Sequence, residues 1–232
     1  MIKFCYHPEP NPAKIALFLE EAGLDYEVMP VDCSKGDQHS PEFRAINPNG
    51  KVPAIVDTDG PGGREARVFD SNAILLYLAE KSGKFLGAAE NRPELLSWLL
   101  FIASGLGPYS SQSVHFQFAA PDGLDYAVNR YRREAERHYQ VLDDHLEGRR
   151  YIVGDDYTIV DMSAWGWLER ASRVRKGEDD PLSPCPNLKR LFDIVDARPA
   201  AVCARAVGKY HPFKRENDGE IKRALLPSNN PS

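Results

Sequence analysis

Two short segments carry residue types that could hold a small peptide ligand. The first, residues 51–56, reads Lys-Val-Pro-Ala-Ile-Val and is a strand candidate with Pro53 near its start. Proline cannot donate a hydrogen bond to a neighbouring strand, so it belongs at the start or the edge of a sheet. If the Val52–Pro53 bond is cis, Val52 can turn its backbone N–H and C=O outward, where an extended ligand could pair with them.

The second segment is the Asp70-Ser71 pair, which opens an apolar helix candidate over residues 71–81. The first N–H groups of a helix have no partner within it and the dipole is positive there, so a carboxylate could bind. Each motif alone is weak, because Val-Pro at a strand start and an acidic residue before a helix commonly have only structural roles. Their order and spacing together predict a socket for a small peptide.

The composition excludes several classes of protein. The chain has 232 residues, of which 42% are hydrophobic, enough for one large core or two modest ones. Its net charge of -5 argues against a nucleic-acid partner. No apolar run approaches the roughly 18 residues of a membrane span, and the N-terminus lacks the pattern of a signal peptide. We therefore expect a cytoplasmic protein without a membrane partner.

The cysteines show no metal-binding pattern. Cys5, Cys33, Cys185 and Cys203 form no Cys-x-x-Cys pair, and the six histidines add no zinc spacing. We expect no metal site and four reduced thiols. Cys5 falls inside a strand candidate, which indicates a buried, small apolar residue.

Strand and helix patterns alternate over residues 1–82. Strands are predicted at 2–6, 26–31, 54–57 and 66–69, and helices at 11–22, 41–46 and 71–81. The β-α-β start favours a parallel, right-handed crossover, and the last two strands form an antiparallel hairpin. The order βαβαββα predicts an α/β domain of thioredoxin-like fold.

The pattern from residue 93 onward is purely helical. Helices are predicted near 93–106, 124–146, 158–169, 187–196 and 199–208. Thr158 and Asp161 have the spacing of a capping box. We therefore predict a linker at 83–92, an all-α C-terminal domain at 93–210 and a polar tail at 211–232 that wraps the surface or stays mobile.

This arrangement resembles the glutathione S-transferase family over nearly the whole chain, from residue 1 to about residue 208. The finer pattern is similar to that of the bacterial Nu class, the glutathione-dependent disulfide-bond oxidoreductases. The similar segments are residues 8–22, 41–43, 47–57, 106–108 and 115–116.

The resemblance implies that the peptide is glutathione, as co-substrate, or glutathione disulfide. The cysteine backbone of glutathione would pair with Val52, and the γ-glutamyl group would meet Asp70 and Ser71. Asp70 stands where the family often has glutamate. The other implied contacts are Pro53 as the cis residue, Gln38 at the glycine end, Lys51 at a carboxylate, and Arg130, donated across a homodimer interface.

The catalytic loop, residues 6–11, departs from the Nu-like pattern, which has threonine in place of Glu9. An ionised Glu9 cannot donate a hydrogen bond and would oppose a nearby thiolate, so it either points away or tunes the site. The amide of Asn11 can donate, and we predict that it is the main sulfur contact. A simple N-cap role for Asn11 is the alternative. Tyr6 is a secondary catalytic candidate, as in the tyrosine-type enzymes.

The expected function is an enzyme that reduces small disulfides by thiol–disulfide exchange with glutathione, without a protein cysteine. Two alternatives stay open. One is conjugation of glutathione to electrophilic or aryl ether substrates, and the other is a non-enzymatic glutathione-binding protein.

Overall fold

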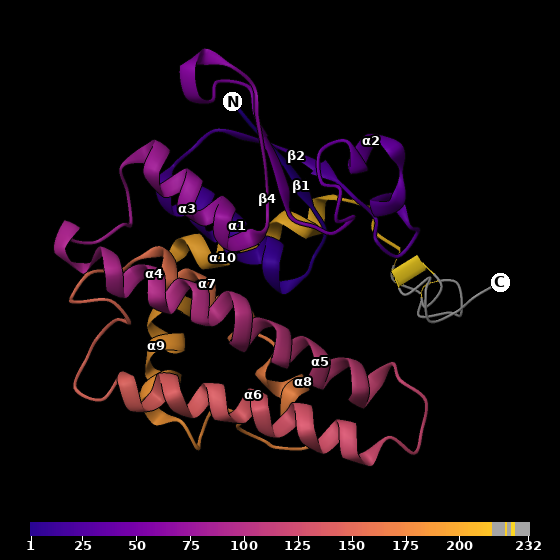
Figure 1. Ribbon diagram of the computed structural model, residues 1–232, viewed down its shortest axis with the longest axis vertical. Helices are drawn as coiled ribbons and strands as arrows, with labels where there is room; N and C mark the ends of the chain where they lie inside the picture. Colours follow the sequence, from indigo (N-terminus) through magenta and orange to yellow (C-terminus); the bar gives the residue numbers. More distant parts are fainter. Residues whose placement is uncertain (215–220, 222–223, 226–232) are drawn as a thin grey trace. The chain divides into compact units, whose positions relative to one another are not determined.

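The chain divides into two compact units in the computed structural model, which describes residues 1–214, 221 and 224–225 (Figure 1). The sheet unit contains Met1–Leu78 and the described residues from Val202 onward, and the helical unit contains Ala79–Ala201. Of the tail predicted at 211–232, residues 215–220, 222–223 and 226–232 lie outside the described residues. No helix in the described part of the chain is long and apolar enough to cross a membrane.

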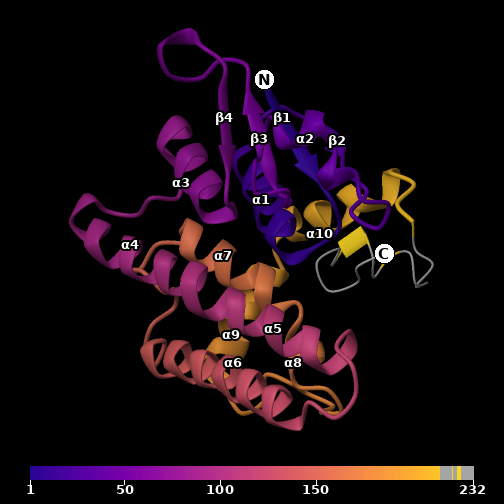
Figure 2. The ribbon, with the colours of Figure 1, turned by 45° about the vertical axis from the view of Figure 1, so that its right-hand side comes forward.

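The sheet unit is built on four strands in the order β2-β1-β3-β4, which lie side by side in Figure 2. They are β1 (Ile2–Tyr6), β2 (Tyr26–Pro30), β3 (Ala54–Asp57) and β4 (Ala66–Phe69). β1 and β2 run parallel with Ile2 opposite Tyr26, whereas β3 is antiparallel to both β1 and β4. The predicted parallel crossover and closing hairpin are therefore confirmed.

Helices α1 (Pro10–Ala22) and α3 (Ser71–Ser82) supply apolar side chains to the main core of this unit. Gly23 ends α1 in the left-handed region, with φ at 63°, as expected of a glycine C-cap. Successive residues of β1 point to opposite faces of the sheet, so Phe4 and Cys5 enter different clusters. The fully buried side chains of the main core are Phe4, Ile15, Leu17, Phe18, Leu19, Ile55, Ile74, Leu75 and Leu78.

A smaller apolar cluster includes the short helix α2 (Pro41–Arg44). Cys5 is 1% exposed and packs there with Cys33 and Phe43, which confirms that Cys5 is a small buried apolar residue. The side chain of Val52 packs against the same cluster. The cluster therefore anchors the residue whose backbone was predicted to meet a ligand.

The helical unit begins with a helix that changes its winding. Residues Arg92–Phe101 form α4, Ile102–Leu106 form a π-helical turn, and Gly107–Phe118 continue as α5. Leu95, Leu99, Ile102 and Leu106 are buried and recur at helical spacing, in agreement with the helix predicted near 93–106. The remaining helices are α6 (Asp125–His145), α7 (Ile159–Leu168), α8 (Ala171–Val174), α9 (Pro186–Asp196) and α10 (Pro199–Ala206), which crosses into the sheet unit.

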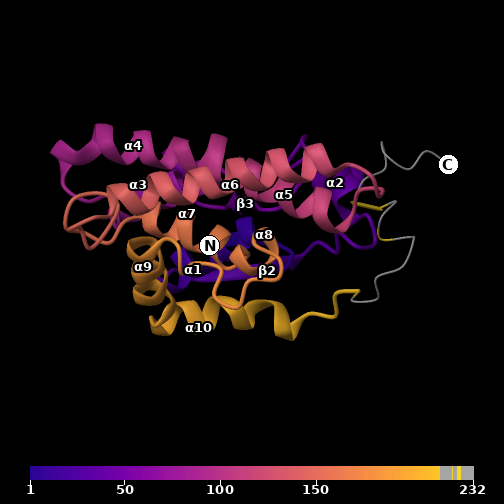
Figure 3. The ribbon, with the colours of Figure 1, turned by 90° about the horizontal axis from the view of Figure 1, so that it is seen from below.

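Helices α5 and α6 pack side by side (Figures 1 and 3), and the π-helical turn lies against α6. A Cβ atom at Gly105 would clash with Nε2 of His138, so glycine permits this close approach. The buried His138 ring packs against the rings of Phe101 and Tyr109, with ring centroids 4.9 and 5.1 Å away. The unusual winding thus coincides with a close approach between the π-helical turn and α6.

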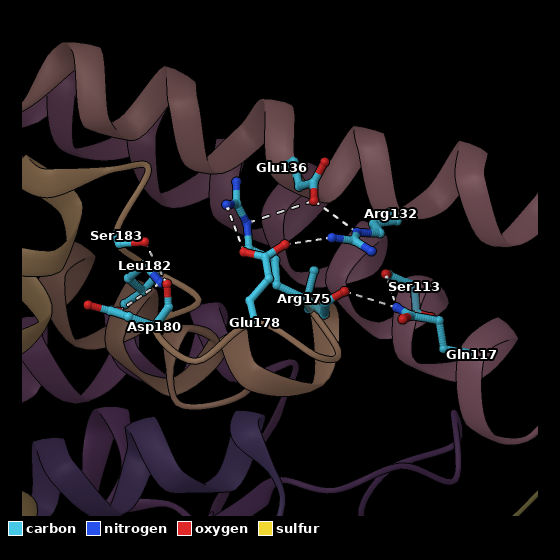
Figure 4. Close-up of polar contacts among 10 residues, drawn as sticks. Ser113, Gln117, Arg132, Glu136, Arg175, Glu178, Asp180, Leu182 and Ser183 are labelled. Carbon is cyan, nitrogen blue, oxygen red and sulfur yellow. Dashed lines mark hydrogen bonds and ion pairs between the residues drawn. The ribbon is translucent and has the colours of Figure 1, made fainter.

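Two polar arrangements fix other parts of the helical unit. The predicted capping box is confirmed at the start of α7. The Thr158 hydroxyl accepts from the backbone N–H of Val160, and the Asp161 carboxylate accepts from the backbone N–H of Thr158. An ion-pair network joins α6 to the turn after α8 (Figure 4). In it Arg132 contacts Glu136 at 3.0 Å and Glu178 at 2.6 Å, and Arg175 contacts the same two carboxylates.

Candidate functional site

The edge predicted to meet a ligand is formed by Val52 and Pro53. The peptide bond between them is cis. The ladder on this side begins at Ala54, which pairs with Cys5 and Phe69, so Val52 lies outside the paired region. Pro53 is buried, and Val52 is half-buried.

The start of α3 combines a cap with backbone strain. Asp70 has φ at 69°, which is uncommon for a residue with a side chain. Its Oδ1 accepts hydrogen bonds from the backbone N–H groups of Asn72 at 2.9 Å and Ala73 at 3.2 Å. Asp70 therefore caps α3, and its exposed side chain stands at the positive end of the helix.

Asn11 and Ser71 are brought together by a hydrogen bond between α1 and α3. The Oγ of Ser71 donates to Oδ1 of Asn11 at 3.2 Å. This contact occupies the acceptor end of the Asn11 amide and leaves Nδ2 as its donor end. The helix starts differently from the prediction, because Pro10 begins α1 and Glu9 occupies the N-cap position without a side-chain cap bond. The simple N-cap interpretation of Asn11 is therefore wrong.

Glu9 is exposed, and its charge acts on residues at the end of β1 and after β2. Burial lowers the pKa of His7, and Glu9 opposes that shift. Burial raises the pKa of Cys33 to about 12, and the charge of Glu9 adds to the effect. The charge of Glu9 thus acts in the same direction as burial, toward the protonated form of Cys33.

Gln38 lies on the 3-10 turn Asp37–His39 and is 5% exposed. The turn over residues 47–50, which leads into Lys51, packs closely against it. Gly50 has φ at 64°, and a Cβ atom there would lie 3.2 Å from the backbone oxygen of Gln38. Asn47 donates from Nδ2 to the backbone oxygen of Lys51. The structure therefore holds Gln38 beside the segment that carries Lys51 and Val52.

Tyr6 is only 3% exposed, because residues near the C-terminal end of the sheet unit, among them Phe213, pack over it. Its ring centroid is 6.1 Å from that of Phe213, and a Cβ atom at Gly208 would lie 3.1 Å from its hydroxyl oxygen. Packing of this kind is the ordinary role of a strand tyrosine.

Arg130 lies in the helical unit, on α6. Its side chain is 56% exposed, and its guanidinium lies 3.8 Å from the carboxylate of Glu134, one turn away. Tyr126, Asn129 and Arg133 surround it on the same surface.

A buried lysine lies near the site, and the sequence did not predict its burial. Lys14 is 1% exposed, and its Nζ donates to Oδ1 of Asn72 at 3.3 Å. Burial lowers its pKa to about 7, and the charge of Asp70 opposes that shift. The available signal was its spacing, since Lys14 lies four residues before Phe18 and therefore on the buried face of α1.

Replacing Lys14 with methionine should change how stability depends on pH. The pKa of Lys14 is about 7 in the folded chain and near its ordinary value of 10.5 when unfolded. The unfolded chain thus binds more protons between these values, so Lys14 makes the free energy of unfolding rise with pH. We expect that free energy to rise between pH 7 and 9 by about 1 kcal/mol per pH unit more in the wild type than in Lys14→Met.

Urea unfolding followed by far-ultraviolet circular dichroism at several pH values measures this difference. The matched control is Lys209→Met, because Lys209 is exposed to solvent in the folded chain. Parallel curves for the wild type and Lys14→Met would contradict a buried, titrating Lys14.

The three buried cysteines, Cys5, Cys33 and Cys185, are poorly suited to act as nucleophiles. Burial raises the pKa of Cys5 to about 11 and also raises that of Cys185. Cys203 is exposed, and all four cysteines are free. Among the residues that the structure describes, no group of three or more His, Cys, Asp or Glu could hold a metal ion.

Comparison with known proteins identifies the family. The family described as "Glutathione S-transferase, N-terminal domain" matches residues 1–80, and "Glutathione S-transferase, C-terminal domain" matches residues 125–193. The disulfide-bond oxidoreductase YfcG of Escherichia coli strain K12 is 44% identical over 202 residues, which cover 86% of this chain and 92% of YfcG. The chain belongs to the glutathione S-transferase family. The predicted family and its two-part fold are confirmed.

Two solved glutathione S-transferases have closely similar structures. The enzyme from Pseudomonas putida has a TM-score of 0.84 and 35% identity, covering 89% of this chain and 91% of that one. Its crystal holds one glutathione disulfide per subunit. The enzyme from Burkholderia graminis has a TM-score of 0.85 and 36% identity, covering 90% of this chain and 89% of that one, and holds two glutathione molecules per subunit.

Proposed function

We propose that this glutathione S-transferase binds glutathione or its disulfide and reduces small disulfides by thiol–disulfide exchange. The observation that carries the proposal is the bond from Ser71 to Asn11, which joins the starts of α1 and α3 within one unit. The cis Val52–Pro53 edge belongs to the same unit. Together they offer a backbone edge, a helix N-terminus and an amide donor to one small peptide. The disulfide-bond oxidoreductase activity in the name of YfcG supports the same reaction.

Each part of glutathione contacts a different part of this socket. The cysteine backbone of glutathione pairs with Val52. Its α-ammonium group meets the carboxylate of Asp70, and its α-carboxylate meets Ser71 at the start of α3. At the other end, Gln38 and Lys51 hold the glycine residue. Asp70 is shorter than the family's usual glutamate, so its approach to the ammonium group depends on the strained backbone of Asp70.

Asn11 acts on the sulfur. Its Oδ1 accepts from Ser71, so Nδ2 points its N–H donors elsewhere and stabilises the glutathione thiolate. The start of α1 adds a positive dipole at the same place. Glu9 acts on His7 and Cys33 rather than as a donor. Tyr6, covered by Phe213, takes no direct part.

The reaction needs two glutathione molecules and no protein thiol. The first thiolate attacks one sulfur of the substrate disulfide, forms a mixed disulfide and releases the other sulfur as a thiolate. A second glutathione thiolate attacks the glutathione sulfur of the mixed disulfide, which releases the second product thiolate and forms glutathione disulfide. The two electrons come from the two glutathione thiols, whose protons end on the product thiols.

A variant without cysteine tests this mechanism. Cys5, Cys33 and Cys185 are replaced with alanine and the exposed Cys203 with serine. We expect kcat/KM for a small aromatic disulfide to stay within a factor of about 3 of the wild-type value, because glutathione supplies both reacting thiols. A loss of activity in a variant whose circular dichroism spectrum is unchanged would refute the cysteine-free mechanism. Calorimetric titration with glutathione and its disulfide tests the binding step separately.

Conjugation of glutathione to electrophiles is a second candidate, favoured by membership of the glutathione S-transferase family. It uses the same thiolate, Asn11 and peptide socket. Steady-state assays with a disulfide and with a chlorinated nitroaromatic compound compare the two reactions in one protein preparation. Binding of glutathione without turnover of either substrate would favour a binding protein instead.

The proposed homodimer, the role of Arg130 and the cytoplasmic location follow the resemblance to the Nu class. A homodimer would let the exposed Arg130 reach the glutathione site of the partner subunit, where a cation suits a second glutathione carboxylate. A cytoplasmic location fits the four free cysteines.

A further inference from the structure

The described end of the chain contacts the loop that carries Gln38. The ring of Phe213 packs against that of His7, with centroids 4.9 Å apart. The backbone N–H of Lys214 donates to Oδ2 of Asp32 at 2.8 Å, across 182 residues of sequence. Asp32 also accepts from the backbone N–H of Ser34 through Oδ1. The C-terminal segment is therefore tied to the start of this loop.

A second tie reaches Gln38 itself. The backbone oxygen of Ala224 accepts from Nε2 of Gln38 at 3.0 Å and lies 3.0 Å from Nε2 of His39. Arg44 donates from Nη2 to Nδ1 of His39 at 3.5 Å, so the His39 proton resides on Nε2 and points to the Ala224 oxygen. One backbone carbonyl thus receives two side-chain donors from neighbouring residues.

This arrangement leaves Gln38 with an unused acceptor. Its Oε1 is buried and has no hydrogen-bond partner, although the residue is only 5% exposed. A buried polar atom without a partner is costly, so a ligand group is expected to supply the missing donor. Gly50, in the turn that leads to Lys51 and Val52, lies against the backbone oxygen of Gln38, so the residue that carries this acceptor lies beside the proposed glutathione edge.

We propose that the Ala224 carbonyl and His39 fix the orientation of the Gln38 amide so that Oε1 accepts the N–H between the cysteine and glycine residues of glutathione. The inference rests on the proposed function. It makes His39 and the Ala224 backbone positioning groups, which act on the ligand only through Gln38. The glycine carboxylate is then left to Lys51.

Two glutathione analogues separate these contacts. γ-Glutamylcysteine lacks the amide N–H, whereas the glycine monoethyl ester of glutathione keeps the N–H and loses the carboxylate charge. The wild type should bind γ-glutamylcysteine about tenfold more weakly than glutathione, because Gln38 Oε1 then stays without a partner. The ester should bind more tightly than γ-glutamylcysteine.

Matched variants test the role of the C-terminal segment. A chain ending at Arg223 lacks Ala224, and a chain ending at Leu225 keeps it. We expect the shorter chain to lose the preference for glutathione over γ-glutamylcysteine, and the longer chain to keep it. His39→Ala should reduce the same preference, and His39→Gln should restore it, because the glutamine amide can donate to the Ala224 oxygen. Gln38→Met has no amide, so it gives the ratio of the two dissociation constants that is expected when the preference is lost completely.

Isothermal titration with each analogue gives the readout, with circular dichroism to establish that each variant is folded. An equal preference in the chains ending at Arg223 and Leu225 would overturn the inference. Tighter glutathione binding by the shorter chain would also overturn it, because Ala224 would then compete with the ligand. Failure of the wild type to bind glutathione would overturn the proposed function as well, whereas glutathione binding without the preference overturns this inference alone.

Discussion

Replacing Asn11 with aspartate should lower kcat for disulfide reduction by about 100-fold to 1,000-fold, the usual effect of removing one donor from a developing anion. Aspartate has the same shape and keeps an oxygen to accept from Ser71 Oγ at the position of Oδ1. It replaces Nδ2, the donor end of the amide, with a second oxygen. The variant therefore keeps the contact between α1 and α3 and removes the proposed contact to sulfur. Its added charge also opposes the thiolate.

The thiolate absorbance of bound glutathione, measured as a function of pH, tests the proposed contact between Asn11 and the sulfur. We expect the pKa of the bound thiol to be higher in Asn11→Asp than in the wild type. Ser71→Ala is the comparison variant, because it keeps the whole Asn11 amide and removes the hydroxyl that orients it. It should raise KM more than it lowers kcat. An unchanged thiol pKa in Asn11→Asp, with glutathione bound, would contradict the role of Asn11.

The features that the sequence predicted correctly depend on neighbouring residues. Pro53 at a strand start and the Thr158–Asp161 capping box each involve residues within a few positions of one another. The same holds for the order of strands, because the apolar periods identify each element and the connections leave few topologies. Asp70 and Ser71 were placed at the start of α3 for the same reason.

The features that it missed join residues far apart along the chain. Asn11 and Ser71 are 60 positions apart, Lys14 and Asn72 are 58 apart, and Gln38 and Ala224 are 186 apart. No local pattern encodes the direction of an amide or the depth at which a lysine is buried. Asn11 illustrates the consequence, since a helix start suggested a capping role, whereas the contact from α3 directs its side chain across to Ser71.

Replacing Asp161 with alanine should lower the free energy of unfolding of the helical unit by about 3 to 5 kcal/mol. The Asp161 carboxylate is fully buried and accepts from the backbone N–H of Ile152 at 2.9 Å through Oδ1. Through Oδ2 it accepts from the backbone N–H of Thr158 at 2.8 Å and from its hydroxyl at 3.2 Å. Alanine leaves these buried donors without a partner and removes half of the capping box of α7.

Tryptophan fluorescence during urea unfolding measures this loss in the correct unit, because Trp98, Trp165 and Trp167 all lie within Ala79–Ala201. Burial raises the pKa of Asp161 to about 6, so the measurement belongs above that pH, where the carboxylate is ionised. The exposed Asp156, replaced with alanine, is the control and should change stability by less than about 0.5 kcal/mol.

Asp161→Asn distinguishes a hydrogen-bond effect from a volume effect. An asparagine fills the same space but has one acceptor oxygen, so it can satisfy either Ile152 or Thr158 and must turn its NH2 group toward the other donor. We expect its loss of stability to be large and intermediate between those of Asp156→Ala and Asp161→Ala. If Asp161→Asn were as stable as the wild type, the capping box would stabilise the helical unit through packing alone. The energetic role assigned to the three hydrogen bonds would then be wrong.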